Sequence, residues 1–404
     1  YILYNDGSIP TTAANADVII TGETTINYFG ISLASGDFNA DGKTDLVVGA
    51  SYYANLIGRA YIFYSQNGQL STNRTIVGNA TGDLFGFSMA PGDYNNDGLI
   101  DLVVGAPGYS TYTGRAYVFY NDGYSLPSTA ATADVTITGE TSGDYFGEIV
   151  VAGDFNADGE MDFAASGEVY AASTGRAYIF HNDGSIPTTA ATADVTITGA
   201  SSNHSFGSAL ASGDFNRDGT IDLVVGAPSL GADHGAAYVF HNDGSIPTAA
   251  GSADVIISSG ESSSNYFGSD IASGDFNGDG RTDLVIGAYG YSTSTGRAYI
   301  FYNDGSIPTT PATADVIITG NTTSDRFGST LVSGDFNIDG RIDLAISASG
   351  YSTNTGRVYI FYNDGSYAST AASADIILTG EATSNYFGYS LAVGDINQDG
   401  IADL

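Results

Sequence analysis

Cysteine is absent from this chain of 404 residues, and cationic side chains are scarce. Without cysteine, neither a disulfide framework nor a thiolate metal site can form, so stability must come from packing and from other kinds of metal site. Only 11 Lys and Arg stand against 45 Asp and Glu, which gives a formal net charge of −34. This balance argues against binding to nucleic acid or to anionic membrane surfaces, because both require basic patches.

Long apolar runs and helical patterns are also missing from the sequence. No run approaches the roughly 20 apolar residues of a membrane span, and no signal-like segment begins the chain. The first residues, 1–7, match the middle of later repeats such as 299–305. We therefore expect the chain to begin inside a repeat and to be a fragment of a longer protein, so that a signal or an anchor would lie outside it.

What the chain has instead is a nine-residue pattern, D-x-N-x-D-G-x-x-D, which occurs seven times and first covers residues 37–45. Oxygen side chains at positions one, three, five and nine form the anionic, flexible ligand set that Ca²⁺ prefers. The glycine at position six permits the sharp turn that the chain needs there. Position seven shares no side-chain chemistry, which fits a ligand supplied by its backbone carbonyl.

The predicted cofactor is therefore Ca²⁺, with up to seven ions and a structural rather than a catalytic role. A β-turn whose Asp and Asn side chains only cap backbone amides is the alternative, but clustered carboxylates without a cation would repel one another in every loop. An EF-hand does not fit, because flanking helices are absent and the twelfth position of the first loop is Val48. The predicted ligands are Asp37, Asn39, Asp41, Lys43, Asp45, Asp93, Asn95, Asp97, Leu99, Asp101, Asp154, Asn156, Asp158, Glu160, Asp162, Asp214, Asn216, Asp218, Thr220, Asp222, Asp275, Asn277, Asp279, Arg281, Asp283, Asp335, Asn337, Asp339, Arg341, Asp343, Asp395, Asn397, Asp399, Ile401 and Asp403.

The dipeptide Phe-Gly marks a longer repeat of 56 to 61 residues, and a period of this length is typical of solenoids and propellers. In the unit that begins at Phe267, four short strands are expected. They are 268–274, rich in small residues; 284–288, a continuous apolar run; 297–302, β-branched and aromatic; and 315–319. In an earlier unit the fourth strand, 135–138, alternates polar and apolar residues, as a strand with one solvent-exposed face does.

Four short strands in every unit predict the blades of a β-propeller. The predicted fold is all-β, a seven-bladed propeller of four-stranded antiparallel blades in a single domain, 1–404. Six full repeats fill residues 29–386. Residues 1–22 would supply the third and fourth strands of one more blade, and 387–404 its first strand, a metal loop and the start of its second strand. The two ends would thus share a blade and close the ring, although the rest of that second strand has no counterpart after Leu404.

The order of these motifs resembles a known family. Phe85-Gly86, the loop 93–101 and Gly105-Ala106-Pro107 follow one another as in the FG-GAP repeat of integrin alpha subunits, and the similarity covers essentially the whole chain. The resemblance implies a seven-bladed propeller with calcium loops on one face and partner binding on the opposite face. Only some blades of integrin alpha subunits carry the loop, whereas every repeat carries it here. The chain therefore looks more like the FG-GAP propellers of microbial or lower-eukaryotic surface proteins.

Tyrosines recur in the loops predicted for the face opposite the metal sites. Tyrosine offers a large amphipathic contact surface at low entropy cost, although duplication of the repeat would also preserve it. Two histidines of one repeat, His204 and His234, fall on the same face. They mark either a specialised site or a copy of the repeat whose sequence has drifted. The candidate partner-binding residues are Tyr52, Tyr53, Tyr109, Tyr112, Tyr170, His204, His234, Tyr291 and Tyr351. The strand aromatics Tyr117, Phe119 and Tyr120 are expected in the core rather than in a platform for sugars.

No Ser/His/Asp arrangement, phosphate-binding glycine loop or zinc motif is present, so we do not expect an enzyme. The chain is predicted to be a calcium-binding propeller, extracellular or on the cell surface, that serves as an adhesion module for a protein or glycan ligand. Two alternatives stay open, a lectin-like carbohydrate binder and an ancillary propeller of a larger secreted enzyme. Nucleic acid binding and membrane insertion of this segment are not expected.

Overall fold

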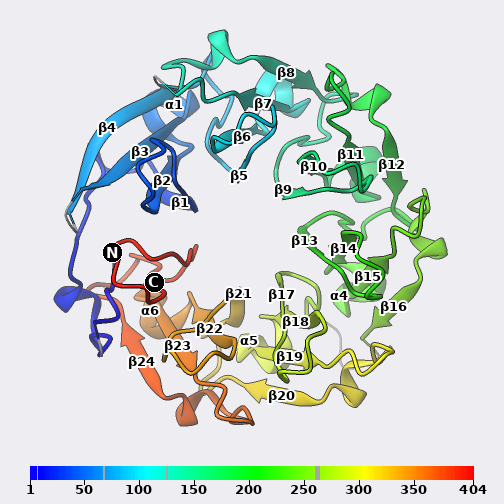
Figure 1. Cartoon of the computed structure of the whole chain (residues 1–404). Coiled ribbons are helices and arrows are strands. Elements are labelled where there is room, and N and C mark those ends of the chain that lie inside the picture. Colours follow the sequence, from blue (N-terminus) through cyan, green and yellow to red (C-terminus); the bar gives the residue numbers. More distant parts are fainter. Residues whose placement is uncertain (7, 67–68, 124–125, 260–263) are drawn as a thin grey trace.

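The computed structural model describes residues 1–6, 8–66, 69–123, 126–259 and 264–404. In this part of the chain, 24 strands form six four-stranded antiparallel sheets that are arranged as a ring (Figure 1). Within each sheet the strands follow chain order, with the first strand nearest the centre of the ring. The all-β class and the four-stranded antiparallel blades predicted from the sequence are confirmed.

The six sheets have closely similar boundaries. They consist of β1 (Phe29–Gly36), β2 (Asp45–Ala50), β3 (Arg59–Gln66) and β4 (Gln69–Val77); β5 (Met89–Gly92), β6 (Asp101–Ala106), β7 (Arg115–Phe119) and β8 (Val135–Thr138); β9 (Val150–Gly153), β10 (Asp162–Gly167), β11 (Arg176–Phe180) and β12 (Val195–Thr198); β13 (Ala209–Gly213), β14 (Asp222–Ala227), β15 (Ala236–Phe240) and β16 (Val255–Ser258); β17 (Ile271–Gly274), β18 (Asp283–Ala288), β19 (Arg297–Phe301) and β20 (Val316–Thr319); and β21 (Phe327–Gly334), β22 (Asp343–Ala348), β23 (Arg357–Phe361) and β24 (Ile376–Thr379).

Short helical turns connect the strands. A single turn labelled α follows the second strand of each sheet, and a 3₁₀ turn precedes the fourth strand in five of the six sheets, with one more near the N-terminus. Three successive residues with positive φ, such as Ser110, Thr111 and Tyr112, make α2 a left-handed turn. The turns are α1 (Tyr53–Leu56), α2 (Tyr109–Tyr112), α3 (Tyr170–Ser173), α4 (Leu230–Asp233), α5 (Tyr291–Ser294), α6 (Tyr351–Asn354), η1 (Ala13–Asn15), η2 (Ala130–Thr132), η3 (Ala190–Thr192), η4 (Ala250–Ser252), η5 (Pro311–Thr313) and η6 (Ala371–Ser373). No helix in the described part of the chain is long and apolar enough to cross a membrane.

The repeated motifs hold neighbouring sheets together. Phe146 of the Phe-Gly motif is fully buried and packs edge-on against Tyr178 and Phe180 of β11, with ring centroids 5.4 and 5.9 Å apart. Its backbone also pairs with Gly114 of the preceding repeat. Gly114 has φ +81°, and a Cβ there would lie 2.1 Å from the Phe146 carbonyl oxygen, so only glycine fits. Tyr117 and Phe119 of β7 are buried as well, which confirms that the strand aromatics belong to the core.

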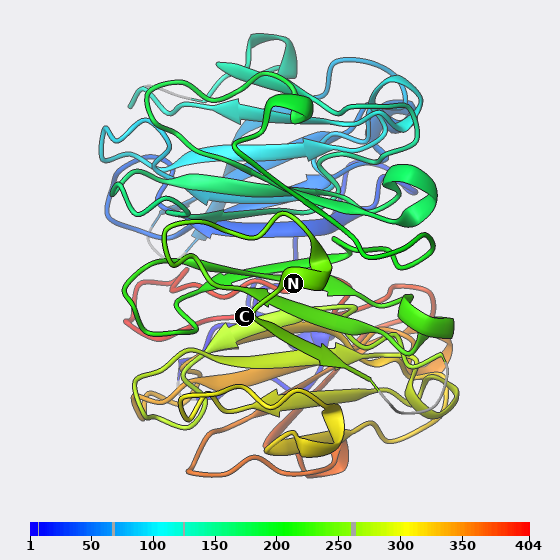
Figure 2. The same ribbon diagram turned by 90° about the vertical axis from the view of Figure 1, so that its right-hand side faces the viewer.

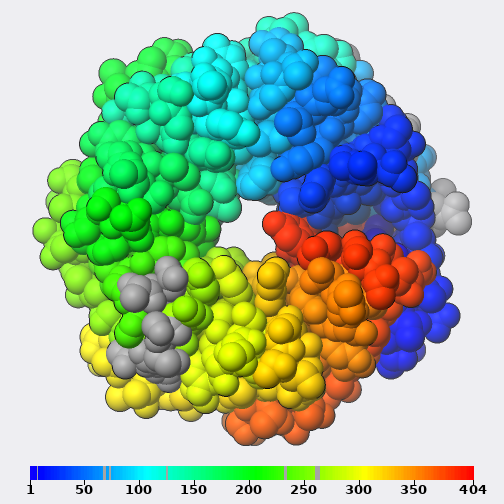
Figure 3. Space-filling view, turned by 180° about the vertical axis from the view of Figure 1, so that it is seen from behind, coloured from blue at the N-terminus to red at the C-terminus, as the bar shows by residue number. Residues whose placement is uncertain are grey.

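The prediction of seven blades is wrong, because the structure has six four-stranded sheets. The two ends do meet, and they lie side by side between the last sheet and the first (Figure 3). The backbones of Leu3 and Leu404 exchange two hydrogen bonds of 2.8 and 3.2 Å. Beyond this, isolated bridges such as Ile2 with Val18 replace the strands expected at 1–22 and 387–404.

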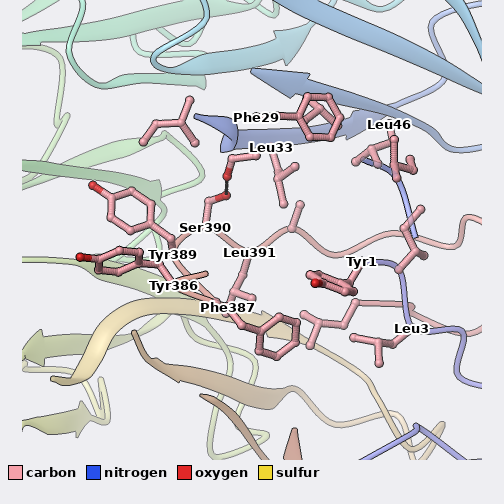
Figure 4. Close-up of a pocket in the computed structure, with 18 of the residues that line it drawn as sticks. Tyr1, Leu3, Phe29, Leu33, Leu46, Tyr386, Phe387, Tyr389, Ser390 and Leu391 are labelled. Atoms are coloured by element: carbon pink, nitrogen blue, oxygen red, sulfur yellow. Dashed lines mark hydrogen bonds between the residues drawn. The ribbon is translucent and has the colours of Figure 1, made fainter. Parts of the chain in front are cut away.

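This junction leaves an apolar cavity of about 680 Å³ between β1 and the C-terminal segment. Figure 4 shows Phe29, Leu33 and Leu46 on one side of it and Tyr1, Phe387 and Leu391 on the other. Ser390 Oγ donates a hydrogen bond of 2.5 Å to the Gly30 carbonyl and so ties the C-terminal segment to β1. The cavity lies where the two end segments form no four-stranded sheet.

Candidate metal loops and partner face

The seven predicted metal loops have one shared conformation. In the loop of the first sheet, the Asp41 N–H donates to Asn39 Oδ1 (2.9 Å), the Gly42 N–H donates to Asp37 Oδ2 (2.8 Å), and the Lys43 N–H donates to Asp41 Oδ1 (3.1 Å). The corresponding three hydrogen bonds recur in all six other loops. Position six has φ between +79° and +89° in every loop, as Gly42 (+82°) illustrates, so the predicted glycine turn is confirmed.

The aspartates at position nine lie in the interior. Asp343, for example, is fully buried, and its carboxylate accepts one hydrogen bond from the Phe336 N–H of its own loop (2.8 Å) and one from the Asn363 N–H after β23 (2.7 Å). Charge-assisted hydrogen bonds of this kind contribute about 1.5–3 kcal/mol each. The position-nine carboxylate therefore fastens the start of each loop to the end of the third strand.

The side chain that follows the third strand then reaches the previous loop. Asn363 Nδ2 donates to the Phe276 carbonyl, at position two of the neighbouring loop, over 2.9 Å. The donors at the seven junctions are Asn5, Ser65, Asn121, Asn182, Asn242, Asn303 and Asn363, and the accepting carbonyls are those of Phe336, Ile396, Phe38, Tyr94, Phe155, Phe215 and Phe276.

Together these contacts form a closed circuit, which we call the carboxylate ring. Every junction repeats the same path, from position two to the position-nine carboxylate, on to the linking Asn or Ser, and across to position two of the neighbouring loop. The linking residue follows the third strand in five sheets and is Ser65, inside β3, in the first. The end segments supply the seventh link through Asn5, Ile396 and Asp403, although they form no sheet. Sequence reasoning missed this ring; its signal is the Asn that follows five of the six third strands and recurs as Asn5.

Burial raises the pKa of the position-nine carboxyls. It is the largest cause at Asp45, Asp101, Asp162, Asp283 and Asp343, whose pKa values rise to about 6, and the two backbone N–H donors oppose it. The charges of the other loop aspartates raise these values further, as those of Asp41 and Asp37 do at Asp45. The pKa of Asp222 and that of Asp403 are raised for the same reason. Each loop therefore concentrates negative charge around a carboxylate that has little contact with water.

The loop residues fit a hard cation in their chemistry. At positions one, three, five and nine each loop carries three carboxylates and one side-chain amide oxygen, and the Asp154 Oδ1 atom is buried without a hydrogen-bond partner in the described structure. As the loops stand, most of these oxygens cap backbone N–H groups, and no three acidic or histidine side chains of the described residues form a tight ligand cluster. A carboxylate oxygen that accepts one N–H keeps a second lone pair for a cation. The position-seven residues donate their N–H groups to the position-five carboxylates.

The opposite edge of the ring carries the α turns (Figure 2) and the predicted partner-binding tyrosines. The structure divides these tyrosines into two groups. Five of them begin an α turn and lie under the guanidinium of an arginine in their own sheet, as Arg115 lies 3.5 Å from the ring centroid of Tyr109. Cation–π contacts of this kind contribute about 0.5–1 kcal/mol at exposed sites. Tyr53, Tyr109, Tyr170, Tyr291 and Tyr351 therefore help to hold the turns in place.

Tyr52 and Tyr112 are different, because they are exposed and each pairs with another tyrosine. The ring centroids of Tyr28 and Tyr52 lie 4.1 Å apart, and those of Tyr112 and Tyr145 lie 4.5 Å apart. Tyr28, Tyr145, Tyr266 and Tyr386 were missed by sequence reasoning, although the tripeptide Tyr-Phe-Gly at four of the seven Phe-Gly sites could have identified them. The exposed members of this face are Tyr28, Tyr52, Tyr112, Tyr386 and Tyr389.

The two candidate histidines, His204 and His234, form backbone hydrogen bonds with different neighbouring repeats. The His204 N–H donates to the Ser173 carbonyl of the preceding repeat, whereas the His234 carbonyl accepts from the Phe267 N–H of the following one. They therefore contact opposite neighbours of the same sheet. Burial lowers the pKa of His204, whose Nδ1 atom has no partner among the described residues.

The repeats of this chain match two related families of repeats in known proteins. The FG-GAP repeat family matches residues 29–63, 85–119, 206–240 and 267–301, and the FG-GAP-like repeat family matches 335–404. Integrin alpha-PS2 of Drosophila melanogaster is 31% identical over 218 residues, which cover 50% of this chain and 15% of that protein. Integrin alpha-5 of Xenopus laevis is 31% identical over 226 residues, 52% of this chain and 20% of that protein.

Two further proteins are similar. Phosphatidylinositol-glycan-specific phospholipase D of Rattus norvegicus is 38% identical over 147 residues, 33% of this chain and 17% of that protein. A six-bladed β-propeller lectin from the fungus Aleuria aurantia superimposes with a TM-score of 0.45 and 10% identity over 88% of this chain and 96% of that chain. The chain thus spans no more than a fifth of the three sequence relatives described here.

The carboxylate ring predicts how single substitutions act. Asn363→Ala leaves the buried Phe276 carbonyl without its donor, so the free energy of unfolding should fall by about 1–3 kcal/mol in chemical denaturation. Asn363→Ser is the matched control, because Ser65 fills the same position in the first sheet and its Oγ donates to Ile396 over 2.6 Å. Equal losses for the two variants would show that the side-chain link itself does not stabilise the ring.

The raised pKa values of the position-nine carboxyls predict that the free energy of unfolding depends on pH when a chelator has removed divalent cations. Because the position-nine carboxyls have a pKa of about 6 in the folded chain and about 3.9 when unfolded, the folded chain binds more protons between these values. Without divalent cations, the free energy of unfolding should therefore decrease as the pH rises from about 4 to 7. Denaturant titrations at several pH values measure it, and Asp283→Asn, which cannot titrate there, should flatten the slope. A stability that increases over this range would contradict the prediction.

Proposed function

Because the chain belongs to the FG-GAP repeat proteins, we propose that it is a calcium-stabilised, protein-binding propeller of an extracellular or cell-surface protein. The observation that carries the proposal is the single conformation of seven acidic loops, each fastened to its neighbours by the carboxylate ring. Calcium in such loops has a structural role, because their carboxylates lie between neighbouring units rather than in a cleft for a substrate.

Mass action supports an extracellular setting. Calcium modules of extracellular proteins bind with dissociation constants of about 10⁻⁴–10⁻³ M, so each site contributes on the order of 1 kcal/mol at millimolar calcium. Several such sites together would rival the net stability of a domain, about 5–15 kcal/mol. The submicromolar calcium of a cytosol would leave sites of this affinity empty.

The face with the α turns is the proposed binding surface. It presents five exposed tyrosines, whereas the opposite edge is occupied by the loops. Tyrosine is enriched at the centres of protein interfaces because it buries a large area at low entropy cost. Two of the similar proteins are named as integrin alpha chains, which favours a protein ligand. The similarity to a phospholipase D supports the view that such a propeller can also be a module of a larger enzyme.

Calorimetry tests the metal part of the proposal. The melting temperature should be higher in 1 mM CaCl₂ than in EDTA, because calcium binds the folded loops and not the unfolded chain. Asp335→Ala, which removes position one of the sixth loop, should reduce this calcium-dependent increment. Asp364→Ala, an exposed turn residue outside the loops, is the control with the same change in charge and should leave the increment unchanged. An identical melting temperature with and without EDTA would contradict the calcium proposal.

Substitution of the exposed tyrosines tests the binding face. The chain should be screened against an array of extracellular proteins and against a glycan array. We expect a protein ligand whose affinity falls at least tenfold in the double variant Tyr52→Ala/Tyr112→Ala, because such residues are frequent hot spots. Ile338→Ala removes an even more exposed apolar side chain from a metal loop and should bind like the wild type. Hits confined to glycans would favour the lectin-like alternative.

A further inference from the structure

The third repeat carries two acidic residues at positions that are not acidic in any other repeat. Glu148 directly follows the Phe-Gly dipeptide, where the other six repeats have Ile, Phe, Ser, Ser, Ser and Tyr. Glu168 directly follows the second strand, where the other five complete repeats have Ser, Pro, Pro, Tyr and Ser. The two substitutions fall in one repeat, and they concern neither the metal loops nor the tyrosine pairs.

The fold brings these two residues to the same end of one strand pair. Beyond the paired strands β9 and β10, the ladder continues, since the Ser166 N–H donates to the Ile149 carbonyl (2.9 Å) and the Gly147 N–H donates to the Ser166 carbonyl (2.9 Å). Glu148 lies between the two bonded residues 147 and 149, and Glu168 lies two residues beyond Ser166. Burial raises the pKa of Glu148, and the charge of Glu168 raises it further.

Neither glutamate forms an ion pair in the described part of the chain, and Arg326, a cation in the lining of the central cavity, pairs with neither of them. The ion pairs found there are Lys43 with Asp41, Arg59 with Glu23, and Arg176 with Glu140. Glu168 Oε2 accepts a hydrogen bond from Ser208 Oγ of the next repeat. Glu148 Oε2 is buried and has no hydrogen-bond partner among the described residues. A buried carboxylate oxygen without a partner is costly unless a proton or a cation satisfies it.

Residues next to the two glutamates line a cavity at the centre of the ring. Ile149 and Ser208 line this cavity of about 600 Å³ together with serines of other repeats, among them Ser88, Ser269 and Ser329. Figure 3 shows an opening at the centre of the ring. The nearest predicted metal loop begins at Asp154, about 20 Å away along β9 at roughly 3.3 Å per residue.

We propose that Glu148 and Glu168, with Ser208 as a neutral oxygen donor, bind one hard divalent cation at the tyrosine-face end of the central channel. Two carboxylates, a hydroxyl and room for water match the way in which Mg²⁺ is held, by one or two carboxylates and several waters, and Ca²⁺ accepts the same oxygens. The cation would neutralise the pair and fix the first strand of the third repeat against Ser208 of the fourth. This site is independent of the seven loops.

Counting bound ions tests the site. The whole chain is dialysed against Mg²⁺ alone and, separately, against Ca²⁺ alone, and the bound metal is measured by inductively coupled plasma mass spectrometry. We expect Glu148→Gln and Glu168→Gln each to bind one ion fewer than the wild type in at least one of the two metals. Glu381→Gln, which removes an exposed carboxylate elsewhere, should bind as many ions as the wild type. The loops are intact in all variants, so failure of the loops to bind calcium would lower every count equally and leave this difference visible.

Thermal stability provides the second measurement. In EDTA at pH 7.5, Glu148→Gln should melt at the same temperature as the wild type or above it, because it removes a buried charge that has no partner. On addition of the metal that the wild type binds, the variant should gain less than the wild type does. Equal ion counts and equal metal-induced shifts in wild type, Glu148→Gln and Glu168→Gln would overturn the proposal and show that the pair only shares a proton.

Discussion

The position-nine carboxylate is the interaction on which the rest of this structure depends. Each one is buried at the end of a metal loop and accepts two backbone N–H groups that belong to different parts of its repeat, as Asp343 does from Phe336 and Asn363. Because Asn363 also reaches the previous loop, the carboxylates of successive repeats are joined into one ring. Desolvation makes this arrangement unfavourable for an ionised carboxylate, and the cation that we propose for each loop would offset that cost. The acidic composition of the chain is thus a consequence of how its repeats are joined.

The ring also explains why the two faces differ. At the loop edge every repeat keeps the same residues at positions one, three, five, six and nine, because a change at position one, six or nine would break hydrogen bonds within its loop or between repeats. At the opposite edge the five arginine-stacked tyrosines hold the α turns, and the positions around them vary. The third repeat has Glu148 and Glu168 where its neighbours have small, apolar or aromatic residues. Residues on this face can therefore change without disturbing the contacts that join the sheets.

Much of the fold follows from local patterns in the sequence. The run Leu-Val-Val-Gly-Ala predicts a strand covered on both faces, and β6 and β14 are buried throughout. The loop glycines predict the positive φ that the structure has. The number of sheets could not be predicted in this way, because it depends on whether the segments near Leu3 and Leu404 pair over enough residues, and they form only isolated bridges. The link from Asn363 to Phe276 and the pairing of Tyr112 with Tyr145 also escaped, since both join different repeats and leave no local periodicity.

The most direct measurement is an anomalous-scattering map from crystals grown in calcium, recorded at a wavelength where calcium contributes a clear signal. We predict a peak in each loop, about 2.3–2.6 Å from the oxygens of positions one, three and five, with every position-nine carboxylate still held by its two N–H donors. Loops that keep this conformation at millimolar calcium but contain only water would contradict the central claim that a cation balances the buried carboxylates. The aspartates would then act as caps of backbone amides alone.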